Sequence, residues 1–91
     1  MNKVRREAIR REIEDIRAAV NDLNNALSRL QELQQEEQDC FDNMNEGLQN
    51  GTTGQRIQEC SEALESGNDG LESAIGDIES AIDEIDNALE A

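Results

Sequence analysis

Apolar residues recur along the second half of the chain at alternating spacings of four and three residues. This spacing places them in one stripe along an α-helix. The members of the stripe are Leu71, Ile75, Ile78, Ile82, Ile85 and Leu89. Ala74, Ala81 and Ala88 recur beside the stripe every seven residues, and such small residues allow a partner helix to approach closely. The pattern predicts one long amphipathic helix.

The first half of the chain carries the same alternation. Its stripe consists of Ile9, Ile13, Ile16, Val20, Leu23, Leu27 and Leu30. A second row at seven-residue spacing flanks it and consists of Ala19, Ala26, Leu33, Cys40 and Gly47. Gln34 and Glu37 interrupt the stripe, close to the expected positions of Ser61 and Asn68. These polar residues predict either a layer that fixes the pairing register or a weak point that opens when a partner binds.

Helix-breaking residues cluster between Asn45 and Gly54 and include the turn dipeptide Asn50-Gly51. Thr52, followed by Gln55, fits a capping box at the start of a second helix. We therefore expect a single domain over residues 1–91, with a helix over 4–43, a turn over 44–53 and a helix over 54–90. The glycines of residues 67–70 mark a candidate kink in the second helix.

A short connection between two helices implies that they pack antiparallel. Facing residues in such a hairpin have a constant sum of residue numbers. With a sum of 100, the facing pairs are Cys40 and Cys60, Leu33 and Gly67, Ala26 and Ala74, and Ala19 and Ala81. The predicted fold is an all-α, antiparallel two-helix coiled-coil hairpin. A narrow stripe is satisfied by one partner helix, which favours a monomer, whereas the marginal size of a lone hairpin favours a homodimer that forms a four-helix bundle.

Composition narrows the class of function. The chain has no histidine, tryptophan, tyrosine or proline, and its formal net charge is −14. This charge opposes direct binding to nucleic acid or to an anionic membrane, so the expected partner is a basic protein surface. The absence of an 18-residue apolar run and of a signal-peptide core predicts no membrane span and a cytoplasmic location, in a host cytoplasm if the gene is viral.

The bases and acids are unevenly distributed. The hairpin register places the basic residues Lys3, Arg5, Arg6, Arg10 and Arg11 beside the C-terminal acids Asp83, Glu84, Asp86 and Glu90. The acids that we select as a partner-binding face are Asp77, Glu79, Asp83, Glu84 and Asp86.

The acidic surface has three interpretations: a solubilising face, a mimic of the nucleic-acid backbone, and a site for divalent cations. A calcium loop over residues 42–47 fails, because Met44 occupies a position that requires an oxygen ligand.

Cys40 and Cys60 share one layer of the expected hairpin. They are interpreted either as a disulfide, which would stabilise by about 3 kcal/mol in the loop-entropy model, or as two buried reduced thiols. No third or fourth soft ligand accompanies them, so we expect no metal site and no cofactor. The protein lacks a histidine, a predicted pocket and a phosphate-binding loop, which catalysis would use, so we expect no enzymatic activity.

The turn region resembles a set of known proteins. Residues 38–49, Gln-Asp-Cys-Phe-Asp-Asn-Met-Asn-Glu-Gly-Leu-Gln, are followed by Gln55-Arg56 and by the related blocks Leu-Glu-Ser-Ala-Ile and Ile-Glu-Ser-Ala-Ile. Over about residues 30–91 this resembles short acidic helical-hairpin proteins of phages and mobile elements of gut bacteria, a group with no assigned activity. The resemblance implies interference with a host defence or replication protein, and it carries over no functional residues.

The sequence therefore predicts a non-catalytic acidic interaction protein. The leading hypothesis is a phage- or mobile-element-derived inhibitor that mimics nucleic-acid charge and occupies a basic surface of a host nucleic-acid-binding or defence protein. The alternative is a structural coiled-coil or four-helix-bundle oligomerisation module without nucleic-acid mimicry.

Overall fold

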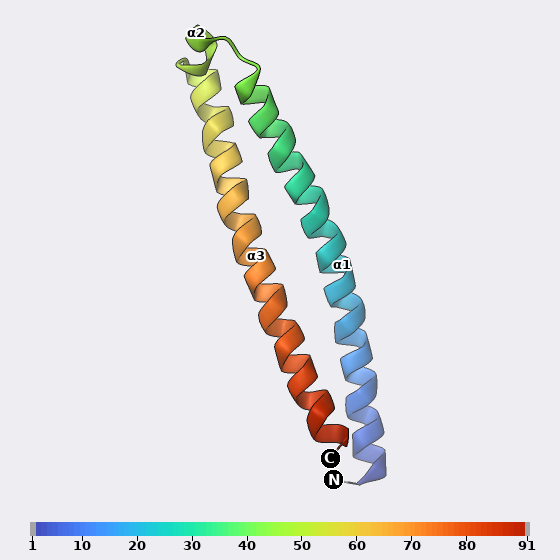
Figure 1. Cartoon of the computed structure of the whole chain (residues 1–91). Coiled ribbons are helices and arrows are strands. Elements are labelled where there is room, and N and C mark those ends of the chain that lie inside the picture. The colour runs from blue at the N-terminus through green and yellow to red at the C-terminus, as the bar shows by residue number, and fades with distance from the viewer. Residues whose placement is uncertain (1, 91) are drawn as a thin grey trace.

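The computed structural model describes residues 2–90 as an antiparallel hairpin of two long helices (Figure 1). Helix α1 spans Lys3–Asp42, the short helix α2 spans Glu46–Gln49, and helix α3 spans Thr52–Glu90. The molecule is a rod of 68 × 15 × 15 Å, with both chain ends at one tip and α2 at the other. The predicted all-α hairpin is confirmed. None of the helices in the described residues is long and apolar enough to cross a membrane.

The helix ends follow local capping chemistry. Asn2 caps α1 through its side-chain oxygen, which accepts a hydrogen bond from the Arg5 backbone N–H at 2.7 Å. Asn45 caps α2 in the same way by accepting from the Leu48 N–H at 2.9 Å. α3 already includes Thr52, and the Gln55 side chain donates to the Asn50 carbonyl oxygen. α3 continues through residues 67–70 without a break.

The turn is held by contacts of α2 with both long helices. The Gln49 side-chain amide donates to the Phe41 carbonyl oxygen at 2.9 Å, which ties α2 to the end of α1. On the other side Gly54 is buried in the first turn of α3. A Cβ atom built on Gly54 would lie 2.4 Å from the Leu48 carbonyl oxygen and 2.6 Å from that of Gln49. Only glycine therefore permits this approach of backbone to backbone.

We expect Gly54→Ala to lower the free energy of unfolding by about 1–2 kcal/mol, because the added methyl group must displace backbone rather than a flexible side chain. The matched control is Gly70→Ala in the same helix, where an added Cβ meets nothing within 4 Å. That substitution should raise stability by about 1 kcal/mol through helix propensity alone. Thermal and urea unfolding measure both, and equal shifts in the two variants would contradict the close approach at Gly54.

The seam between α1 and α3 is apolar toward the chain ends and polar toward the turn. The buried apolar residues are Ile13, Val20 and Leu27 from α1 and Ile75, Ile82 and Leu89 from α3. Nearer the turn the buried residues of α3 are Ser61 and Asn68. The Ser61 hydroxyl donates to the Gln38 side-chain oxygen at 3.0 Å, so Gln38 joins Gln34 in the polar part of the seam, whereas Glu37 lies half-buried in the row of Ile16 and Leu23. Asn68 Nδ2 is buried and has no hydrogen-bond partner within the described residues.

Candidate interaction surfaces

Only one of the two apolar rows in each predicted stripe fills the seam. In α1 the buried row is Ile13, Val20 and Leu27, whereas Ile16 and Leu23, three residues further along, are 42% and 43% exposed. α3 repeats this arrangement. Its buried row is Ile75, Ile82 and Leu89, and the row that remains exposed consists of Leu71 at 40%, Ile78 at 36% and Ile85 at 44%. A single partner helix therefore leaves one row of each stripe partly exposed.

The two exposed rows lie on the same side of the hairpin. Three residues correspond to a rotation of about 60° around an α-helix, so each exposed row is turned by that angle from its buried row. In both helices the exposed row follows the buried row by three residues. Because the helices are antiparallel, this rotation turns both exposed rows toward one face of the hairpin. The residues four positions after the buried row turn the other way. Arg17 and Asp86 occupy such positions, and their ion pair lies on the opposite face.

We call the first of these surfaces the apolar face. It consists of Ile16, Leu23, Leu33, Leu71, Ile78 and Ile85, with Ala19, Ala26, Ala74, Ala81 and Ala88 beside them. The alanines precede the buried rows by one residue, which turns them further onto this face. Ala19, Ala74 and Ala81 are exposed, so the prediction that they face one another inside the seam was wrong. The helices meet through larger side chains at the adjacent positions instead.

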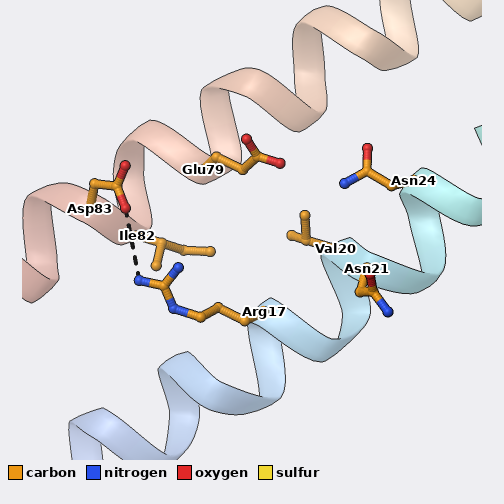
Figure 2. Close-up of a pocket in the computed structure, with 7 residues that line it drawn as sticks. All are labelled: Arg17, Val20, Asn21, Asn24, Glu79, Ile82 and Asp83. Atoms are coloured by element: carbon orange, nitrogen blue, oxygen red, sulfur yellow. Dashed lines mark ion pairs between the residues drawn. The ribbon is translucent and has the colours of Figure 1, made fainter.

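The opposite surface, which we call the polar face, is closed by ion pairing across the seam. Arg17 pairs with Asp86 and lies 3.8 Å from the Asp83 carboxylate. Figure 2 shows the Arg17 side chain extended toward Asp83, with Val20 and Ile82 between the two helices. Asn21, Asn24 and Glu79 complete a shallow, open depression there of about 360 Å³. The depression is open to solvent and is lined mainly by polar side chains.

The five acids selected from the sequence fall in different electrostatic surroundings. Asp77, Glu79, Asp83 and Glu84 are exposed and Asp86 is half-buried. Two of them pair with Arg17, which is not among the five N-terminal bases expected in this role. These are the ion pairs found within residues 2–90, so the prediction placed the neutralising charge too close to the N-terminus. The positions of Asp77, Glu79 and Glu84 remain available to an external cation or basic surface.

Cys40 and Cys60 are free thiols, and both are exposed. The sequence was interpreted as giving either a disulfide or two buried thiols, and two exposed free thiols agree with neither interpretation. The reason is the one that applies to the alanines: the cysteines belong to the row beside the seam, and Gln38 and Ser61 occupy the seam at that level. In the part of the chain that the structure describes, no group of three His, Cys, Asp or Glu side chains could hold a metal ion.

Comparison with protein-family models, with curated proteins and with solved structures found no match for this chain.

The apolar face was not predicted from the sequence, because each apolar stripe was taken as narrow enough for one partner helix. The signal was nevertheless present. A row of alanines beside two rows of leucine and isoleucine widens the apolar sector beyond what one neighbouring helix covers.

Proposed function

We propose that this protein is a non-catalytic structural module that assembles through its apolar face into a four-helix bundle. The observation that supports the proposal is the alignment of six Leu and Ile side chains, each 36–50% exposed, on one face of a two-helix layer. Contiguous apolar surfaces of this kind mark sites of protein association. The opposite face is polar, so the hairpin has the pattern of one layer in a two-layer domain.

The small size of the seam supports the same function. Within the described residues six apolar side chains are buried, although they order two helices of 40 and 39 residues. Stability of long helices comes mainly from packing of an amphipathic face rather than from propensity. Packing a second layer on the apolar face would bury the exposed rows and complete the core that each stripe begins.

Sedimentation equilibrium tests this function. The chain has a mass of 10.1 kDa, so assembly gives a mass of at least twice that value at micromolar concentration. We expect Ile78→Glu to weaken assembly at least about 100-fold, because it places an unpaired charge in the packed layer. The matched control is Ser80→Glu, which adds the same charge to the outer side of the same helix and should leave assembly unchanged.

Circular dichroism of both variants establishes that the hairpin still folds, and Leu23→Ser provides a milder change on the other helix. A wild-type mass of 10.1 kDa up to about 100 µM would contradict the proposed function, since association of a functional module requires a dissociation constant within reach of that concentration.

A second candidate function uses the acidic surface. Asp77 and Glu84 are exposed and lie seven residues apart on α3, on the side away from α1 and away from the apolar face. Bundle formation would leave these carboxylates in water and double the net charge of −14 to −28 in the dimer. A rigid array of this charge suits the basic surface of a nucleic-acid-binding protein, such as a host defence protein.

The mimic hypothesis predicts salt-sensitive binding. Proteins captured from a bacterial lysate at about 50 mM salt should be released near 200 mM, because several charge contacts act together. Neutralising Asp77, Glu79, Asp83, Glu84 and Asp86 to the corresponding amides should abolish capture. The control neutralises an equal number of acids near the turn: Asp39, Asp42, Glu46, Glu59 and Glu62. Unchanged capture by the first variant would exclude the mimic.

A further inference from the structure

We propose that the occupant of the apolar face is a second copy of this chain packed antiparallel to the first, with α1 on α1 and α3 on α3. This inference rests on the proposed function and names its partner and geometry. The alternative arrangement of two copies is parallel, with α1 of one copy on α3 of the other. Both bury the apolar face, so the charged residues around it decide between them.

The extent of the apolar face sets the register. In α1 the row of Ile16 and Leu23 begins at the half-buried Ile9 and the alanine row ends at Leu33, and the midpoint of this stretch is residue 21. An antiparallel copy that covers this stretch fully is related by a two-fold axis near residue 21. Residues that face each other across the two copies of α1 then have numbers that sum to about 42.

This register brings opposite charges together at the edges of the apolar face. Arg5 continues the row of Ala19 and Ala26 toward the N-terminus, and Glu37 continues the row of Ile16 and Leu23 toward the turn. Their numbers sum to 42, so Arg5 of each copy lies beside Glu37 of the other. Glu12 lies in the alanine row and Arg29 lies beside that row. Their residue numbers sum to 41, so they form a second pair. The two-fold axis repeats both pairs.

The surrounding segments show the same complementarity. Residues 1–11 contain five bases and one acid, and the segment that faces them, residues 31–41, contains four acids and no base. The acids of α3 lie mainly on its polar and outer sides, so the contact between the two copies of α3 is made by Leu71, Ile78, Ile85 and the alanines. Asp15 and Asp22 share the row of Arg29 at the solvent rim of the contact between the two copies of α1.

A parallel dimer would pair the bases of residues 1–11 with the C-terminal acids of α3 in the other copy, but it would leave the acids of residues 31–41 facing the acids of residues 59–69. Residues 32–65, which form the turn end of the rod, contain nine acids and one base, a net charge of −8. Parallel packing would bring two such ends together, and like charges directly opposite one another disfavour association. Antiparallel packing places the two turn ends at opposite tips. The charge pattern therefore selects the antiparallel copy.

Distance measurement with a single nitroxide label tests the orientation. Cys40 is exposed near the turn, so a Cys60→Ser variant offers one natural attachment site. Cys40 lies 19 residues from the axis, which gives a separation between labels of roughly 57 Å at 1.5 Å per residue. A parallel dimer would place the labels within about 25 Å, since neighbouring helices lie about 10 Å apart. The control carries Asp22→Cys with both natural cysteines replaced by serine, and its short distance reports dimerisation in either orientation.

Charge exchange provides an independent test. We expect Glu12→Arg to raise the dissociation constant by roughly tenfold, because two pairs are lost and replaced by repulsion against Arg29. Glu12→Arg combined with Arg29→Glu should restore the original affinity. In a parallel dimer the two residues do not meet, so the double variant would show no rescue.

The outcomes separate the two levels of the proposal. A distance of roughly 57 Å with rescue by charge exchange supports the antiparallel dimer. A dimer with a short Cys40 distance overturns the orientation and leaves the oligomerisation module intact. A wild-type monomer overturns both.

Discussion

Replacing Ile82 by alanine is expected to lower the free energy of unfolding by about 2–5 kcal/mol. Ile82 is 3% exposed and lies in the middle of the apolar part of α3, next to Val20 in the seam. Among residues 2–90 only six apolar residues are buried, so a cavity at this level removes a large share of the packing between the helices. Neighbouring backbone relaxes little, because both helices continue unbroken on either side.

Chemical unfolding monitored by circular dichroism at several protein concentrations measures this loss. Val4→Ala is the control, because Val4 is also an aliphatic residue of a long helix but is 79% exposed. Its effect should stay within about 0.5 kcal/mol. Equal effects of the two substitutions would contradict the position of Ile82 in the seam.

Replacing Asn68 by leucine is expected to raise the free energy of unfolding by about 1–3 kcal/mol. Asn68 is 4% exposed, occupies the same row as Ile75 and Ile82, and its side-chain N–H group lacks a partner among the described residues. A buried donor without a partner costs about 1–3 kcal/mol, and the leucine side chain would extend the apolar seam by one heptad.

Asn87→Leu is the matched control, since Asn87 is an exposed asparagine of the same helix. It should change stability little in the same unfolding experiment. A loss of stability in Asn68→Leu would show that this asparagine is satisfied, for example by water, and that the polar layer stabilises the hairpin. Hydrogen exchange adds a second readout, because the leucine should slow the exchange of amides near Ser61.

Several features of the fold were predicted from the sequence because they depend on local physics. Alternating spacings of four and three residues can bury a continuous row only on a helix. The asparagines and glycines of residues 45–54 end one long helix and begin the next, and a short connection forces antiparallel packing. The predicted register was also nearly right, since Arg17 and Asp83 meet with a sum of 100.

The contacts of individual side chains could not be predicted in the same way. A heptad pattern offers two apolar rows and one alanine row, and rotation of the helix about its axis, by about 60° between the two apolar rows, decides which row faces the partner. Such a rotation leaves the sequence pattern equally satisfied. For this reason Ala19, Ala81, Cys40 and Cys60 were assigned to the seam, while the structure places them on the exposed side.

The sequence by itself determined the all-α hairpin, the position of its turn and the excess of negative charge, because each follows from periodicity, helix-breaking residues or composition. Only the tertiary structure decided that Ile82 is buried, that Ile78 is 36% exposed, and that Arg17 pairs with Asp83 and Asp86. The physical reason is that side-chain packing between two helices selects one rotation of each helix about its axis. That rotation divides the apolar stripe into a filled seam and an open face.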